Sequence, residues 1–108
     1  MEEMSEEKLK EVLEKISEKI TEERITVYHQ VNNKVRIDNP LRELVEVAVT
    51  NRSPDFTYTS GKSSYGEMIA RVYIFGNIAI ICEQWQPNFG YSWDERRITL
   101  IKLKSPSD

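Results

Sequence analysis

The residues best able to bind a partner lie between positions 85 and 97. Large aromatic side chains and arginines follow one another closely there: Trp85, Phe89, Tyr91, Trp93, Arg96 and Arg97. Large aromatics with arginine are typical of the energetic centres of protein interfaces. The same combination of ring stacking and positive charge binds single-stranded nucleic acid. Asp94 and Glu95 place carboxylates between the rings and the guanidinium groups, which disfavours nucleic acid.

This stretch has two interpretations. In the first, it is a contact surface for a protein partner, with a small ligand or nucleic acid as less favoured occupants. In the second, Trp85 and Phe89 are buried and close one end of the core. We predict binding residues at Trp85, Tyr91, Trp93, Arg96 and Arg97.

His29 is the only histidine and a weak catalytic candidate. Strand pairing about an Asn32-Asn33 turn would place His29 opposite Arg36. A metal-independent nuclease needs a base of near-neutral pKa and cations for the phosphate. A lone histidine excludes a two-histidine scheme, and the sequence positions no carboxylate as its partner. A solvent-facing strand histidine is therefore the favoured interpretation.

Two other motifs carry little chemistry. The single cysteine, Cys82, cannot form an internal disulfide or a cysteine-rich metal site, and its place within an apolar strand favours a buried structural role. Ser60–Ser63 (SGKS) resembles the end of a phosphate-binding loop, but Phe56 stands where that motif needs glycine. We expect a surface turn there, and neither a metal nor a cofactor.

Composition predicts one folded domain over residues 1–104 and a tail over 105–108. Of the 108 residues, 39% are hydrophobic and 31% charged, which is ordinary for a folded domain. No apolar run approaches the ~20 residues of a membrane helix, and the acidic N-terminus does not resemble a signal peptide. We therefore expect a cytoplasmic protein. Glutamine is scarce, as in thermophilic proteins, although six asparagines count against such a source.

The chain is organised around Met68–Gln86, where two apolar runs meet at Gly76-Asn77. A two-residue hairpin turn pairs Phe75 with Ile78 and sets the register of the ladder. Both faces of this hairpin are apolar near the turn, so both need cover. We expect helices on one face and a further layer or a second copy of the chain on the other. The candidate dimer face comprises Arg71, Tyr73 and Ile80.

The remaining elements follow from capping, periodicity and turn signals. We predict a helix over 5–22 capped by Ser5, strands over 24–31 and 34–38, and an element over 40–51 that reads as helix or strand. The Asn39-Pro40 start favours helix. A short strand over 56–59, a turn over 60–64, the central hairpin, a loop over 87–95 and a strand over 96–104 complete the chain.

The predicted order α-β-β-α-β-β-β-β describes an α+β domain. It has an antiparallel sheet of five or six strands, with a long N-terminal helix and a second short helix packed on one face. This order is similar to that of the cystatin-like and nuclear-transport-factor-like cone folds. The resemblance implies a ligand pocket between sheet and helix.

The sequence favours a small intracellular, non-enzymatic binding or assembly module that forms a homodimer. The alternatives are a nucleic-acid-binding protein or metal-independent nuclease using His29 and Arg36, and a small-molecule binder. The net charge of −3 gives no general attraction to nucleic acid.

Overall fold

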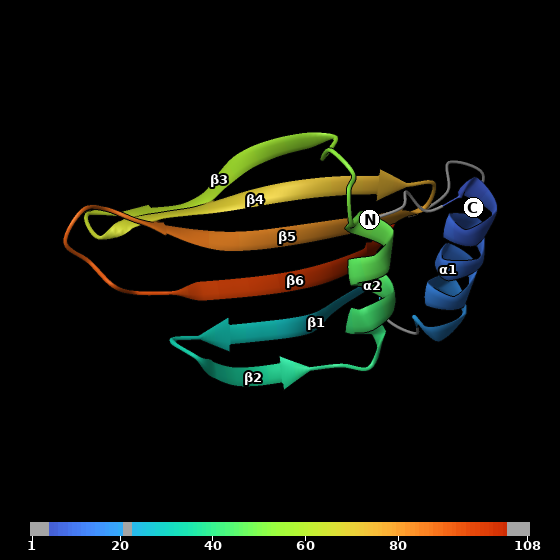
Figure 1. Ribbon diagram of the computed structural model, residues 1–108, viewed down its shortest axis with the longest axis horizontal. Helices are drawn as coiled ribbons and strands as arrows, with labels where there is room; N and C mark the ends of the chain where they lie inside the picture. The colour runs from blue at the N-terminus through green and yellow to red at the C-terminus, as the bar shows by residue number, and fades with distance from the viewer. Residues whose placement is uncertain (1–4, 21–22, 104–108) are drawn as a thin grey trace.

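Six antiparallel strands form one sheet, and two helices pack together against one of its faces (Figure 1). The computed structural model describes residues 5–20 and 23–103. The predicted α+β class and element order are confirmed. The elements are α1 (Glu6–Lys19), β1 (Arg24–Val31), β2 (Lys34–Asp38), α2 (Leu41–Val49), β3 (Phe56–Ser63), β4 (Gly66–Phe75), β5 (Ile78–Pro87) and β6 (Glu95–Lys102).

The strands lie in the order β2-β1-β6-β5-β4-β3. The register predicted for the central hairpin is confirmed over its whole length, from Phe75 opposite Ile78 to Met68 opposite Trp85. Gly76 takes a positive φ of 58° at the turn, which glycine adopts without steric cost. The central hairpin therefore folds as its local sequence dictates.

The register predicted for the β1–β2 hairpin is wrong beyond its first two pairs. Asn32 and Asn33 both take positive φ, as a primed turn requires. A bulge then inserts Arg36, so that His29 faces Ile37 and not Arg36. A bulge leaves two residues opposite one and shifts every later pair by one position. The expected His29–Arg36 pair is thus not formed across the strands.

α1 begins at the cap that the sequence predicts, and Asn39 contributes a hydrogen bond just before α2, which follows Pro40. The Ser5 hydroxyl accepts a hydrogen bond from the Lys8 amide at 3.2 Å, and the Asn39 carboxamide oxygen accepts one from the Leu41 amide at 2.8 Å. Such caps satisfy amides that have no partner within the helix. α2 settles the ambiguous 40–51 segment as helix. α1 ends at Lys19. The last two positions of the predicted helix, 21–22, the last position of the predicted final strand, 104, and the predicted tail, 105–108, lie outside the described residues.

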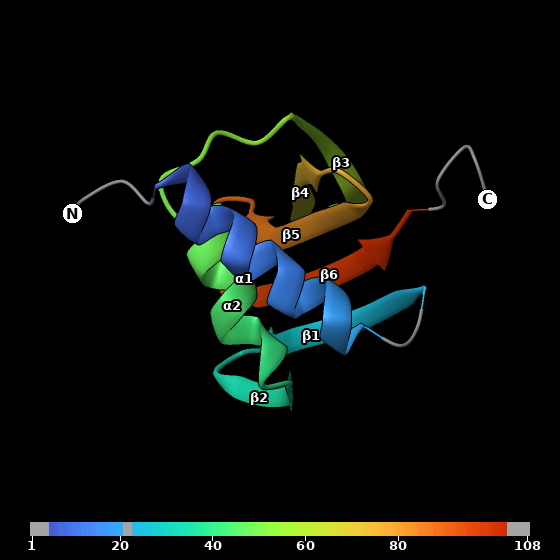
Figure 2. The same cartoon turned by 90° about the vertical axis from the view of Figure 1, so that its right-hand side faces the viewer.

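The main core lies between the helices and the sheet (Figure 2). Ile16 from α1, Val45 from α2 and Ile80 from β5 are fully buried within it. Tyr73 belongs to the same cluster and is only 4% exposed. Two residues of the candidate dimer face, Tyr73 and Ile80, are thus covered by the chain's own helices, and only Arg71 of that set is exposed.

The opposite face of the sheet carries a second, smaller apolar cluster of Ala70, Val72 and Ile81. Phe56 and Tyr58 of β3 stand opposite Val72 and Ala70 in the ladder, and so share this face. Both rings are about half exposed. This face therefore has apolar side chains at its surface and no helix of the described chain over it (Figures 1 and 2).

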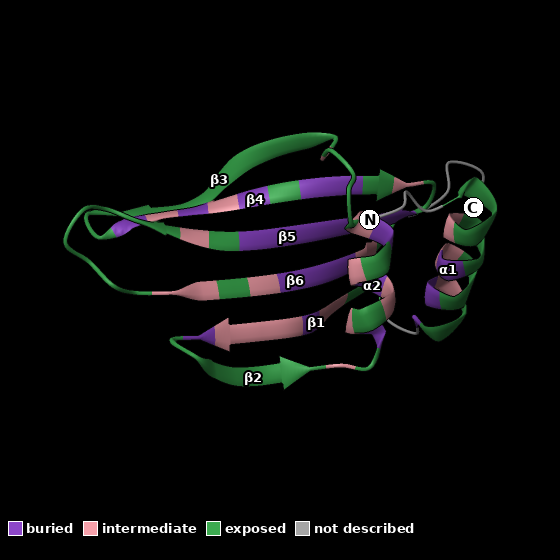
Figure 3. Ribbon diagram, viewed as in Figure 1, coloured by how far each residue is buried: buried purple, intermediate pink, exposed green. Residues whose placement is uncertain are grey.

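β3 is longer than the sequence indicates. It runs through the Ser60–Ser63 stretch that was expected to be a turn, with a register shift between Thr59 and Gly61. Every residue of β3 is exposed, and the strand forms an edge of the sheet (Figure 3). Because neither face of this edge strand is buried, its sequence does not need to alternate between apolar and polar residues, and it therefore resembles a loop. Neither described helix is long and apolar enough to span a membrane.

Candidate functional site

An aromatic pocket of about 440 Å³ lies at the end of the sheet away from the helices. We call it the aromatic pocket; its lining residues are Ser63, Tyr65, Trp85, Tyr91, Ser92 and Trp93. They come from three segments: the end of β3 and the turn after it, β5, and the loop over residues 88–94. In Figure 1 the turn and the loop lie side by side at the left-hand end. The volume is in the range of small-ligand sites.

Hydrogen bonds at both ends hold the 88–94 loop against the sheet. At one end the Asn88 amide donates to the Tyr65 carbonyl at 2.9 Å, and its side chain donates to the Ser64 carbonyl at 2.9 Å. At the other end the Asn32 amide donates to the Asp94 carbonyl, and the Asp94 amide donates to the Asn32 side chain, both at 2.8 Å. Bonds at Asn88 and at Asp94, the latter to Asn32, therefore fix both ends of the segment that carries the aromatic residues.

Two of the four pocket rings pack at right angles, and the two indole nitrogens differ in their hydrogen bonding. Tyr65 and Tyr91 form an edge-to-face pair with centroids 4.9 Å apart and an interplanar angle of 88°. The Trp93 indole N–H donates to Glu95 Oε1 at 3.2 Å. The Trp85 indole nitrogen is buried without a hydrogen-bond partner among the described residues. A donor left in that state costs about 1–3 kcal/mol.

A row of polar side chains crosses the same face beside the aromatic pocket. His29, Arg97 and Glu83 are successive cross-strand partners on β1, β6 and β5. Arg97 donates from Nε and Nη2 to the two Glu83 oxygens at 2.9 and 3.1 Å. The Ser60 hydroxyl donates to Glu83 at 2.8 Å. His29 Nε2 lies 2.9 Å from Glu95 Oε2, the carboxylate that also accepts from Trp93.

Glu83 is a buried carboxylate that is paired with Arg97 and hydrogen-bonded to Ser60. The residue is 7% exposed. Burial alone raises the pKa of the carboxyl group, but the hydrogen bonds from Arg97 and Ser60 lower it more, so the net pKa lies below its ordinary value. Glu83 is therefore ionised at neutral pH and holds Arg97 in place. The bidentate contact also neutralises the charge that Arg97 would offer a ligand.

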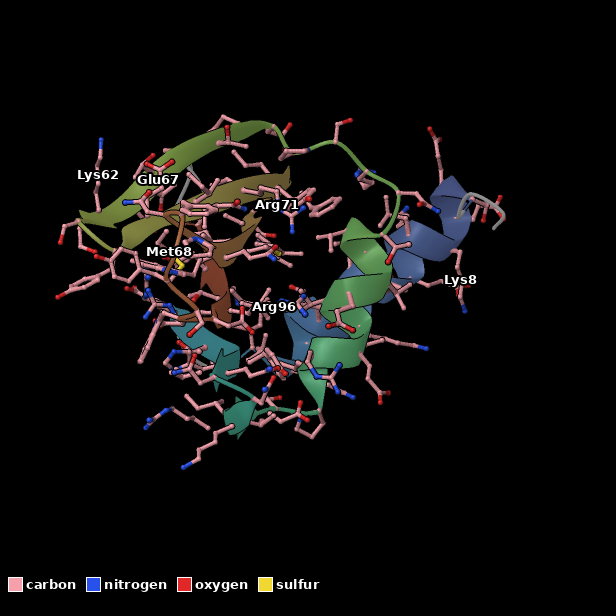
Figure 4. The ribbon with its side chains drawn as sticks, turned by 60° about the vertical axis from the view of Figure 1, so that its left-hand side comes forward. Lys8, Lys62, Glu67, Met68, Arg71 and Arg96 are labelled. Carbon is pink, nitrogen blue, oxygen red and sulfur yellow. The ribbon has the colours of Figure 1, made fainter. Side chains whose placement is uncertain are left out.

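The structure divides the residues predicted to bind. Trp85, Tyr91 and Trp93 come together in the aromatic pocket, and Arg97 lies on the same face. Arg96 lies on the opposite face, because side chains alternate along a strand. Figure 4 shows Arg96 with Arg71 on the side of the sheet that faces α2. The adjacent arginines thus serve different surfaces.

Phe89 does not close the core as the second interpretation of the loop required. Phe89 is fully exposed, at a position between the loop's two anchors. Trp85 is partly buried, as a residue of the pocket wall. The 88–94 loop therefore carries one fully exposed aromatic side chain, Phe89, next to residues that line the aromatic pocket.

Cys82 and His29 lie on opposite faces of the sheet and do not form a thiol–imidazole pair. Cys82 belongs to the core cluster under the helices, whereas His29 contacts Glu95 on the other face. Burial raises the pKa of the Cys82 thiol, and Arg71 and Arg96 only partly offset it. Over residues 5–20 and 23–103 there is no cluster of three or more histidine, cysteine or acidic residues suited to a metal ion.

Sequence reasoning missed Tyr65, Ser63 and Ser92 as members of the site. One signal could have found Tyr65: extending the hairpin register places Gly66 opposite Pro87, so the turn before Gly66 must lie beside the loop after Pro87. Gly66 also permits this approach, because a Cβ there would lie 2.4 Å from the Gln86 carbonyl oxygen.

Comparisons of this chain with protein-family models, curated proteins and solved structures find no match. The similarity of its element order to the cone folds therefore stays a prediction. The aromatic pocket lies on the face away from the helices, unlike the sheet–helix pocket which that resemblance implies.

Proposed function

We propose that the protein is a non-enzymatic binding module that contacts a protein partner through the aromatic pocket. The observation that carries this proposal is the convergence of four aromatic side chains on one cavity while three of them remain about half exposed: Tyr65 57%, Tyr91 47% and Trp93 45%. Exposed apolar groups gathered in one place mark contact sites. Phe89 extends the same surface.

Anchoring of the 88–94 loop supports the proposal on energetic grounds. A partner that meets a loop already held by Asn88 and Asn32 does not have to order it. Binding is stronger when this entropic cost has been met in advance. Arg97 borders the surface, but its bond to Glu83 makes it a positioning group for the sheet face.

Partner capture with matched variants tests the proposal. Tagged wild-type protein, Trp93→Ala, Tyr91→Ala and the control Arg96→Ala are each incubated with extract of the native host. The proposal expects a partner protein that wild type and Arg96→Ala retain and both pocket variants lose. A partner retained by all four proteins, or lost only with Arg96→Ala, would refute the pocket as the contact site. RNA in the wild-type eluate that the pocket variants lack would instead favour the nucleic-acid alternative.

We further propose that the protein forms a homodimer in the cytoplasm through the face opposite the helices. Support comes from the exposed Phe56, Tyr58 and Ile74 around the second apolar cluster. Two such faces would shield each other from water. Analytical ultracentrifugation at micromolar concentration should show a dimer that Tyr58→Glu dissociates. A monomer in the wild-type protein would remove this part of the proposal.

One observation favours metal-independent RNA cleavage as the second candidate function. His29 pairs with Glu95 and stands across the strands from Arg97, so a base, an orienting carboxylate and a guanidinium share one face. The hydrogen bonds from Arg97 to the Glu83 carboxylate weaken the case for RNA cleavage, because they leave little positive charge to bind a phosphate. Incubation with single-stranded RNA in the presence of a chelator tests it. Cleavage that His29→Ala abolishes would support it, and intact RNA with wild type would remove it.

A further inference from the structure

We infer that the aromatic pocket is a cage for a quaternary ammonium group, carried on a trimethylated lysine of the partner protein. The inference rests on the proposed binding function and names the chemistry that its site would recognise. Aromatic rings carry partial negative charge on their faces, and they attract a cation placed over them. Tryptophan and tyrosine do so best, and these are the only aromatic residue types in the pocket lining.

The arrangement of the rings suits a roughly spherical cation. Tyr65 and Tyr91 stand perpendicular to each other, so their faces point in different directions. Trp85 and Trp93 complete the lining from β5 and from the end of the loop. A flat nucleobase stacks on one aromatic face, whereas an ammonium group with methyl substituents can contact rings on several sides. The shape therefore favours a cation over a stacked base.

The pocket has no cation of its own. The two cation–π contacts of the described chain lie elsewhere: Arg42 over Tyr28 at 5.3 Å and Arg52 over Phe75 at 4.7 Å. Arg97 lies in the row of polar side chains on the same face, and its guanidinium group is paired with the Glu83 carboxylate. No arginine of the two cation–π contacts or of the Glu83 pair therefore competes with a positive ligand for the pocket.

Two carboxylates, Asp94 and Glu95, follow Trp93 at the anchored end of the loop. Glu95 accepts the Trp93 indole N–H, which draws the carboxylate against the pocket wall. Asp94 precedes it at the anchored end of the loop. A cation placed over Trp93 would gain from these carboxylates, and a phosphate or carboxylate ligand would be repelled. Charge complementarity therefore selects a cationic occupant over an anionic one.

Intrinsic fluorescence offers a specific assay, because the protein's two tryptophans both line the pocket. Four probes are titrated: a short peptide with trimethyllysine, the same peptide with unmodified lysine, the same peptide with the uncharged carbon analogue of trimethyllysine, and phosphatidylcholine vesicles. We expect saturable quenching by the trimethyllysine peptide, with affinity at least about tenfold above the uncharged analogue. Such a difference corresponds to 1.4 kcal/mol and lies within the range of cation–π contributions.

Matched variants at one position separate ring chemistry from general packing. Tyr91→Phe keeps a ring and should bind the trimethyllysine peptide within about threefold of wild type. Tyr91→Leu keeps an apolar side chain without a ring, and should lose at least about fivefold for that peptide but little for the uncharged analogue. Both keep the two tryptophans as reporters. Because Tyr91 is 47% exposed, neither change removes core packing. Equal losses for both peptides with Tyr91→Leu would contradict the cage.

Each outcome decides the inference. Equal binding of the charged and uncharged peptides would overturn the cage and indicate a neutral apolar pocket. The proposed function would still stand in that case if partner capture depends on Trp93. Binding to vesicles but not to the peptide would overturn the assigned carrier. Absence of quenching by all four probes would overturn the cage. If the pocket variants also retain every partner, the proposed function would fail separately.

Discussion

Replacing Glu83 by glutamine should destabilise the protein by about 2 kcal/mol at neutral pH. The change removes one negative charge and keeps the shape of the side chain. In the native protein that carboxylate accepts two hydrogen bonds from Arg97 and one from Ser60, on a side chain that is 6% exposed. The glutamine amide can accept at one atom only, and its NH2 group would face the guanidinium.

The magnitude follows from the burial of the two partners. Breaking a fully buried ion pair costs about 3–5 kcal/mol, because the remaining charge is left without a partner away from water. The Arg97 side chain is 38% exposed, so water can partly solvate it after the change. The expected loss is therefore about 2 kcal/mol, close to the contribution of one or two charged hydrogen bonds.

Urea unfolding of wild type and Glu83→Gln measures this difference. With a slope of about 1–3 kcal/mol per molar for a small domain, the midpoint should fall by roughly 1 M at unchanged slope. The difference should depend on pH in a defined direction. The folded-state pKa of Glu83 is lowered, so its contribution is present above the unfolded-state pKa and is lost as the pH falls through the folded-state pKa. The two proteins should then unfold at similar urea concentrations.

Glu67→Gln provides the control, since Glu67 lies on the other face of β4 and forms no ion pair among the described residues. It should change stability by less than about 0.5 kcal/mol. Equal midpoints for wild type and Glu83→Gln at neutral pH would refute the role given to the Glu83–Arg97 pair. A difference that stays constant as the pH falls would refute the electrostatic explanation.

Two substitutions and one labelling experiment test other parts of the structure. Trp93→Ala should alter the free energy of unfolding by about 1 kcal/mol, because the ring is 45% exposed; a loss of ~3–5 kcal/mol in urea unfolding would show a core role. Native Cys82 should react with a thiol reagent far more slowly than the unfolded protein does, because it is buried with a raised pKa; fast native labelling would contradict this. Gly66→Ala should cost about 1–3 kcal/mol, since its Cβ would meet the Gln86 carbonyl oxygen at 2.4 Å; an unchanged melting temperature would show that the β4–β5 hairpin shifts freely.

The central hairpin could be predicted from sequence because its information is local. A two-residue turn at Gly76-Asn77 sets the register, and β-branched residues on both strands leave no competing periodicity. The cap at Ser5 and the hydrogen bond from the Leu41 amide to the Asn39 side chain are local signals of the same kind. For the 40–51 segment the apolar spacing allowed strand or helix, and the segment forms α2, as the Asn39-Pro40 start favours.

The β1–β2 register could not be predicted because a bulge leaves no clear mark in the residues around it. Arg36 is inserted opposite the step from His29 to Gln30, and nothing in its type distinguishes it from its neighbours. The true partner of His29 is Glu95, which is 66 residues away in the chain. Such a contact depends on β6 lying beside β1, and that strand order follows from the global packing.

The aromatic pocket was predictable in part. The density of rings between positions 85 and 93 marks the loop as a contact segment, and three of these residues do line one cavity. Its other wall comes from the turn after β3, which the sequence presents as a polar loop. Arg96 lies on the other face of the sheet from the pocket because side chains of adjacent residues in a strand point to opposite faces.

The most direct test of the aromatic pocket as a ligand site is a two-dimensional NMR titration that follows the indole N–H signals of Trp85 and Trp93. The probe is the trimethyllysine peptide, and the reference is its uncharged analogue. We predict that both indole signals shift saturably with the charged peptide, and that Tyr91→Leu weakens the response. Indole signals that stay in place through saturating peptide, or that shift equally with the uncharged analogue, would contradict the assigned chemistry of the pocket.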